Sequence, residues 1–156
     1  MRAVVCTTFD GIDALSCVDD APEPPMTEGA VRLKVHAAGI NFADTLMCKG
    51  QYQVKPPFPF SPGLEVGGEV LEVAPGVTRV KPGDRVMATV HYGGYASEAV
   101  TDASTVYAIP DNLDFISAAA FPIVYGTSHV GLRDKLKLQA GETLLVHGAA
   151  GGVGGA

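Results

Sequence analysis

The chain has 156 residues, of which 47% are hydrophobic and 18% are charged, and its formal net charge at pH 7 is −6. A chain of this length and composition can bury a sizeable core, which excludes an intrinsically disordered protein. The negative charge argues against nucleic acid or an anionic membrane surface as a partner, and no apolar run has the length of a membrane-spanning helix.

The cysteines and histidines indicate neither a disulfide framework nor a metal site. Cys6, Cys17 and Cys48 are odd in number and lie far apart in the sequence, which favours reduced thiols. No Cys-x-x-Cys pair occurs, and the four histidines are scattered. The first residues lack the basic-then-apolar pattern of a secretory signal. We therefore predict a soluble, cytoplasmic protein without a metal.

Short β-like runs alternate with turn signals over residues 1–110. The apolar residues alternate strictly in 31–36, as in a strand with one solvent-facing side. Pro75-Gly76, Pro82-Gly83 and Gly93-Gly94 predict tight turns. Many short strands at close spacing predict a barrel or sandwich. The predicted strands are 3–6, 30–36, 65–73, 85–90 and 95–100.

The sequence becomes helical in its last third. Residues 114–120 predict a helix, for which Asp111 or Asn112 is available as the N-cap. Pro122 interrupts or restarts this helix, and helical character continues over 123–132. A mainly β region is therefore followed by an α/β region.

A glycine-rich loop, AAGGVG at 149–154, follows a short apolar strand predicted at 143–146. Its spacing is that of the dinucleotide-binding pattern G-x-G-x-x-G, with Ala149 in place of the first glycine. Gly151 would let the backbone approach a pyrophosphate, and Gly154 would let the next helix pack on the strand. The loop alone is a weak signal, and a glycine-rich tail without a function is the alternative.

Four motifs in matching order and spacing resemble the medium-chain dehydrogenase/reductase superfamily, and within it the zinc-free quinone oxidoreductases. They are AAGINFAD at 37–44, PGLEVGGEV at 62–70, PGDRV at 82–86 and GAAGGVG at 148–154. The resemblance implies a mainly β chain with some α structure. A GroES-like, partly open β-barrel that forms the catalytic domain is expected over 1–122. A linking helix, then the first strand and glycine turn of a Rossmann domain, are expected over 123–156. We expect this second domain to be incomplete.

The same resemblance implies chemistry without zinc. The zinc alcohol dehydrogenases of the superfamily carry a cysteine where Asn41 stands and a histidine where Leu64 stands. Neither asparagine nor leucine is a zinc ligand, because zinc binds thiolate, imidazole or carboxylate groups. A zinc-dependent alcohol dehydrogenase is therefore the disfavoured alternative.

Two residues are catalytic candidates by resemblance. Asn41 matches a residue near the nicotinamide. Judged without the resemblance it is an N-cap for a helix over 42–48, and the two roles are compatible. Tyr52 matches an active-site tyrosine that donates a proton in related enoyl reductases. Its alternative is a half-buried loop aromatic without a role in the reaction.

The resemblance also implies an NADPH site in the intact protein. The residues expected to bind the cofactor are Asn41, Gly126, Thr127, Ala150, Gly151, Gly152, Val153 and Gly154. The implied reaction is hydride transfer from NADPH to a quinone or activated enone, by a protein that forms a homodimer. The 156-residue chain alone is expected to be inactive. The competing hypothesis is a non-enzymatic binding or assembly module on a GroES-like scaffold.

Overall fold

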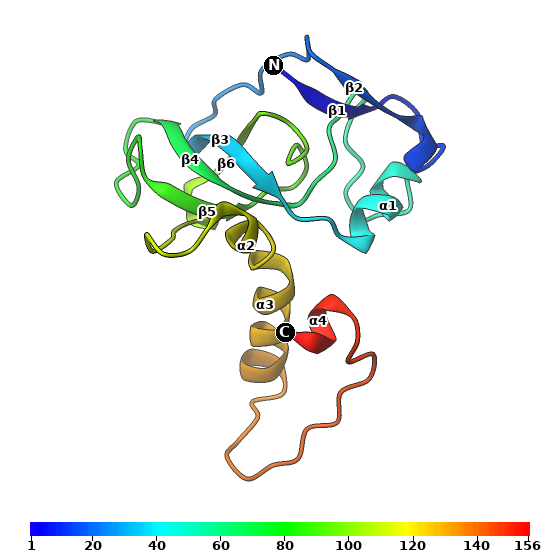
Figure 1. Cartoon of the computed structure of the whole chain (residues 1–156), viewed down its shortest axis with the longest axis vertical. Coiled ribbons are helices and arrows are strands. Elements are labelled where there is room, and N and C mark those ends of the chain that lie inside the picture. The colour runs from blue at the N-terminus through cyan, green and yellow to red at the C-terminus, as the bar shows by residue number, and fades with distance from the viewer.

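The computed structural model describes residues 1–156, which form a sheet-bearing body and a protruding C-terminal segment (Figure 1). Helix α3 (Pro122–His129) projects away from the body. The chain then returns along an extended loop, which places α4 (Gly152–Gly155) beside α3. None of the helices combines the length and apolar character needed to cross a lipid bilayer.

The body contains two antiparallel sheets and two short α-helices. Its strands are β1 (Ala3–Cys6), β2 (Leu15–Val18), β3 (Ala30–Ala38), β4 (Glu65–Val73), β5 (Arg85–Thr89), β6 (Glu98–Asp102) and β7 (Val106–Ala108). Its helices are α1 (Phe42–Cys48) and α2 (Phe115–Ala119), with 3₁₀ turns η1 (Ile12–Ala14) and η2 (Ala103–Thr105). A π-helical segment, η3 (Val130–Lys135), continues α3 in the protruding part.

The larger sheet has the strand order β6–β3–β4–β5–β7, and each neighbouring pair is antiparallel. The alternation in β3 turns Val31 and Leu33 into the core, where both are fully buried. Eleven buried residues from this sheet and its connections form one apolar cluster. The sheets stay open and do not close into a cylinder. The prediction of a mainly β, partly open architecture is therefore confirmed.

The smaller sheet, β1–β2, packs over α1, and the free edge of β1 is bonded to the body, with Val4 N–H donating to the Tyr95 carbonyl at 2.8 Å. Two isolated bridges, Ala3 to Ala96 and Cys6 to Phe60, link it to the rest of the fold. A second apolar cluster lies beneath it, and Tyr52 packs against this cluster. The buried members of this cluster are Cys6, Met47, Cys48, Phe60 and Leu64.

Two adjacent glycines in β4 allow the body to pack closely on both sides of that strand. A Cβ atom at Gly68 would overlap the carbonyl oxygen of Lys34 in β3. A Cβ atom at Gly67 would overlap the carbonyl oxygen of Phe115 at the start of α2. Only residues without a side chain fit both places, so α2 packs directly against the sheet.

Arg85 holds the chain that leads into α2. Its guanidinium donates to the carbonyl oxygens of Asp111 at 2.8 Å and Leu113 at 2.6 Å. The same group lies 4.7 Å from the ring centre of Phe115, and His36 stacks on that ring at 4.4 Å. These contacts fix the position from which α3 departs.

Most predicted elements of the body are confirmed, with local corrections. The strand predicted at 95–100 begins only at Glu98. Gly93-Gly94 is not a tight turn, because their N–H groups donate to the carbonyls of Ser61 and Gly63 across the neighbouring loop. The N-cap of α2 is Asp114, whose carboxylate accepts the Ser117 N–H at 2.8 Å, and not Asp111 or Asn112.

The strand predicted at 143–146 is wrong, because these residues adopt an extended but unpaired conformation. Leu145 is 76% exposed. A parallel strand needs hydrogen-bonded neighbours, and no other strand of residues 1–156 lies alongside this segment. The predicted glycine turn does form, and it leads into α4.

The glycine pair of β4 makes a prediction about stability. Replacing Gly68 with alanine should lower the free energy of unfolding by about 1–3 kcal/mol, because the new methyl group meets a fixed carbonyl of β3. Urea unfolding of the purified chain measures this change. The control is Gly126→Ala in α3, where a Cβ atom meets nothing within 4 Å. Unfolding of Gly68→Ala at the wild-type urea concentration would contradict the prediction.

Candidate functional site

Asn41 is the N-cap of α1, directly after the end of β3. It forms a capping box with Asp44, whose Oδ2 accepts the Asn41 backbone N–H at 2.7 Å. The alternative that the sequence offered for Asn41 is therefore confirmed. Capping leaves a second role open, because the side-chain amide of Asn41 also reaches a neighbouring strand.

Asp44 is a buried carboxylate, 4% exposed, that is held by neutral donors. Its Oδ2 also accepts the Tyr95 hydroxyl at 2.6 Å, while its Oδ1 has no hydrogen-bond partner. Burial, reinforced by the hydrogen bond to Asp44 and its charge, raises the pKa of Tyr95 far above its usual value. The phenol of Tyr95 is consequently a fixed hydrogen-bond donor at physiological pH.

Glu65, the first residue of β4, links Asn41 to the protruding segment. It is 2% exposed, and its Oε1 accepts the side-chain N–H of Asn41 at 2.9 Å. Its Oε2 accepts the backbone N–H of Ile123, in the first turn of α3, at 2.8 Å. The carboxylate thus lies between the end of β3 and the N-terminal end of α3, where the helix dipole favours negative charge.

Tyr52 lines a cavity of about 420 Å³ at the junction between the body and α3. Leu64 and Ile123 line the same cavity, and the wall opposite is formed by Val90 and His91. Asn41 does not line it, but is tied to it through the Glu65 contact with Ile123. The two catalytic candidates are therefore linked through Glu65 and Ile123, although they do not line the same cavity.

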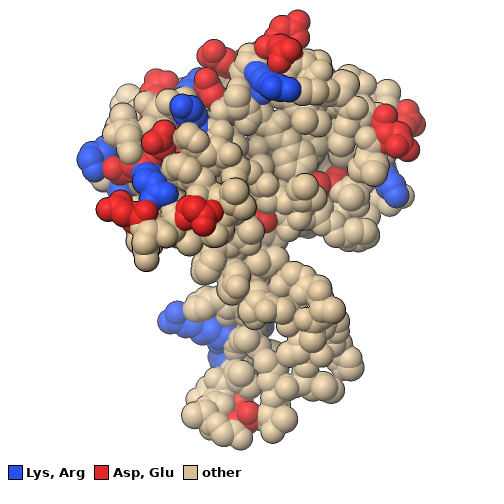
Figure 2. Space-filling model, viewed as in Figure 1, with Lys and Arg blue, Asp and Glu red and all other residues tan.

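The glycine-rich loop of the C-terminal region packs against α3 at Val124 and Ser128, which lie on the face of the helix turned away from Gly126. Gly126 and Thr127 are exposed on this helix. One residue further on, the Ser128 hydroxyl donates to the Val153 carbonyl of α4 at 2.8 Å. A Cβ atom at Gly154 would lie 3.0 Å from the Cα of Ala149, so this glycine lets the turn close on itself. On the face shown in Figure 2, most of the protruding segment is uncharged.

Residues 27–111 match the model of the alcohol dehydrogenase GroES-like domain family. The chain belongs to this family. It is 44% identical to quinone oxidoreductase-like protein 2 of Rattus norvegicus over 98% of this chain and 43% of the relative. A probable oxidoreductase from Mycobacterium abscessus has a TM-score of 0.90 and 40% identity, over 99% of this chain and 49% of that one.

The quinone oxidoreductase of Thermus thermophilus, whose structure was also solved with NADPH, is a further relative. It has a TM-score of 0.83 and 36% identity, over 99% of this chain and 48% of that chain. The predicted resemblance to the quinone oxidoreductases of the medium-chain superfamily is confirmed. The chain spans about half the length of the relatives that it matches.

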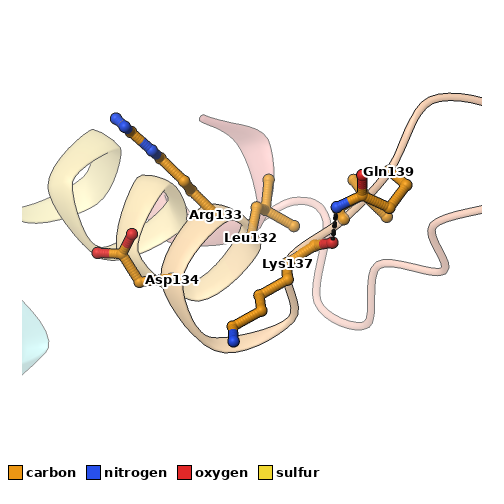
Figure 3. A pocket seen from close by; sticks show the side chains of 6 residues that line it. Leu132, Arg133, Asp134, Lys137 and Gln139 are labelled. Atoms are coloured by element: carbon orange, nitrogen blue, oxygen red, sulfur yellow. Dashed lines mark hydrogen bonds between the residues drawn. The ribbon is translucent and has the colours of Figure 1, made fainter.

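No set of three or more histidine, cysteine, aspartate or glutamate side chains in this GroES-like domain or its C-terminal segment comes close enough to hold a metal ion. Of the two residues that the resemblance places at zinc-ligand positions, Asn41 donates to Glu65 and Leu64 lines the Tyr52 cavity. An open hollow beside η3 contains none of the predicted site residues (Figure 3). It is lined by Leu132, Arg133, Asp134, Lys137, Leu138 and Gln139.

Sequence reasoning missed how the buried acids of this family member are used. Asp44 and Glu65 hold neighbouring segments together through hydrogen bonds, and no motif in the sequence predicts their partners. One signal was present, because Glu65 is a charged residue placed directly between the apolar residues Leu64 and Val66. Tyr95 carries no comparable signal, because its partner lies 51 positions away in the sequence.

The half-buried Tyr95 and the buried Cys48 predict a loss of stability at alkaline pH. Burial raises the pKa of the Cys48 thiol to about 11, and that of Tyr95 rises as described above. The unfolded chain, with values of about 8.5 and 10, releases these protons first. The stabilisation is therefore complete below about pH 8.5 and is lost as the pH rises toward and beyond the folded-state values.

Urea unfolding between pH 8 and pH 11 tests this. The double variant Cys48→Ala/Tyr95→Phe should show a flatter decline than the wild type, although its stability at neutral pH is lower. Tyr107→Phe, on the exposed strand β7, is the control and should decline as the wild type does. Equal slopes for the double variant and the wild type would refute the assignment.

Proposed function

We propose that this chain forms the catalytic part of an NADPH-dependent oxidoreductase that reduces quinones or activated enones without zinc. The observation that carries the proposal is the junction at which the Tyr52 cavity, Asn41 and the start of α3 meet around Glu65. It lies in a chain whose relatives are quinone oxidoreductases. We assign residues 1–122 to the catalytic domain and residues 123–156 to the linking helix and the start of the dinucleotide-binding domain.

The residues that would hold NADPH lie along the protruding segment and at its base. Asn41 would bind at the nicotinamide end, and Gly126 and Thr127 would bind from α3. The loop of Ala150, Gly151, Gly152, Val153 and Gly154 would meet the phosphates, and it fits that task because its backbone is not covered by side chains. When bound, NADPH supplies the hydride.

A substrate that accepts hydride readily suits a site without a Lewis acid. Quinones and activated enones spread the developing negative charge over a conjugated oxygen. The Tyr52 phenol would donate a hydrogen bond or proton to that oxygen. Leu64 and Val90 give the cavity part of an apolar wall against which a flat ring could pack, and Thr89 and Thr101 add polar groups to the same lining.

The activity assay compares two proteins. The protein as its gene encodes it should oxidise NADPH in the presence of a naphthoquinone. Residues 1–156 alone should not, because a Rossmann site binds the dinucleotide across a sheet that they do not form. Loss of NADPH absorbance, corrected for a quinone-only blank, measures both. If the gene-encoded protein neither binds nor oxidises NADPH, the proposal fails and the non-enzymatic binding module is favoured.

Tyr52→Phe tests the proton donor in the gene-encoded protein. Turnover should fall by about a hundredfold while the NADPH dissociation constant stays unchanged, because the phenol acts on the substrate and not on the cofactor. Steady-state kinetics and fluorescence titration with NADPH measure the two quantities. Tyr107→Phe provides the control. An unchanged turnover number in Tyr52→Phe would remove Tyr52 from the reaction.

A further inference from the structure

The Glu65 carboxylate is held from both sides by groups of different elements. Each of its oxygens accepts one N–H, from the Asn41 side chain at 2.9 Å and from the Ile123 backbone at 2.8 Å. The backbone is fixed as well, because the Gly39 N–H donates to the Glu65 carbonyl at 3.1 Å. A Cβ atom at Gly39 would lie 2.6 Å from Glu65 Cδ, so only glycine leaves room for this carboxylate.

No lysine or arginine pairs with Glu65, although the side chain is 2% exposed. A buried carboxylate without a cation is costly unless hydrogen bonds and local dipoles replace the lost water. Two N–H donors and the N-terminal end of α3 provide that replacement. An apolar residue would fill this place at the start of β4 without the cost, so the position of the charge itself calls for an explanation.

The two donors lead to the two halves of the candidate site. Because an ionised carboxylate only accepts hydrogen bonds, the Asn41 amide must turn its NH₂ group toward Glu65, which leaves its carbonyl to the Asp44 backbone N–H of the capping box. Ile123 lies in the first turn of the helix that carries Gly126 and Thr127, and Ser128 of that helix binds the glycine-rich loop. The Glu65 carboxylate therefore links the residue expected at the nicotinamide, Asn41, to the helix that contacts the phosphate-binding loop.

We propose that Glu65 is a positioning residue for hydride transfer. It orients the Asn41 amide and fixes the position of Asn41 relative to α3. This inference rests on the proposed function. Hydride transfer requires the nicotinamide within about 3–3.5 Å of its acceptor, so a small error in the relative placement of Asn41 and α3 lengthens the transfer distance. Glu65 need not touch cofactor or substrate to have this effect.

Glutamine is an informative replacement because it has nearly the same shape. A carboxylate offers acceptors on both oxygens, whereas an amide offers an acceptor on one side and a donor on the other. In Glu65→Gln, the new side chain would have to set its NH₂ group against either the Asn41 amide or the Ile123 N–H. One of the two hydrogen bonds is then lost, and the position of Asn41 relative to α3 is less well fixed.

The experiment uses the protein as its gene encodes it, with NADPH, a naphthoquinone and NADPH deuterated at the transferred position. Glu65→Gln should lower turnover by about tenfold to a hundredfold, raise the NADPH dissociation constant and increase the deuterium isotope effect on turnover. The control is Glu69→Gln, on the same strand, which is partly exposed and pairs with His36. It should leave all three values unchanged.

The isotope effect separates positioning from a general loss of structure. A smaller folded fraction lowers the amount of active protein but leaves the isotope effect and the dissociation constant as they were. If Glu65→Gln does not fold, Glu65→Asp replaces it. That variant keeps both acceptors but withdraws them by one methylene, and the same changes are expected.

Two results can overturn the inference, and they differ from failure of the proposed function. A wild-type protein that reduces no quinone or enone refutes the function itself. An active wild type, together with wild-type turnover, NADPH affinity and isotope effect in a folded Glu65 variant, refutes the role of Glu65 alone. A decrease in turnover without a change in the other two values also refutes it.

Discussion

The absence of side chains at two neighbouring positions of the central strand is the constraint on which the rest of the structure depends. Gly67 and Gly68 let the backbones of α2 and β3 approach β4 from two directions. Because α2 then lies directly on the sheet, the next helix leaves the body beside the first residue of the same strand. The distance that Glu65 must bridge to Ile123 is short only for this reason.

The two buried acids of the body share one mode of stabilisation. Neither Asp44 nor Glu65 forms an ion pair, and each is held by N–H or O–H donors from other elements. Asn41 contacts both, through its backbone N–H in one case and its side chain in the other. Such a network tolerates few substitutions, because removing any donor leaves a buried carboxylate with fewer hydrogen bonds. Its members are therefore better suited to fixing geometry than to adding stability.

The sequence predicted those elements whose signals are local. Helix α1 and strand β4 were predicted to the residue, because an N-cap marks the start of the helix and the turn signal Pro75-Gly76 follows the strand. The strand at 143–146 was predicted from composition alone, and it fails since its pairing partners are not set by its own residues. Tyr95 shows the same limit within the site. Its hydroxyl finds Asp44 only after the loop at Gly93-Gly94 has folded against Gly63, a contact that no spacing rule contains.

The position of the small β1–β2 sheet over two of the three cysteines has a chemical consequence. Cys17 is exposed on β2, whereas Cys6 and Cys48 are fully covered beneath the sheet. An alkylating reagent will therefore reach one thiol in the native state and the other two only while the sheet is lifted. The high pKa of Cys48 slows its reaction further, since the thiolate is the nucleophile. The rates at which the three thiols are modified thus measure, without any added label, how often the β1–β2 sheet opens.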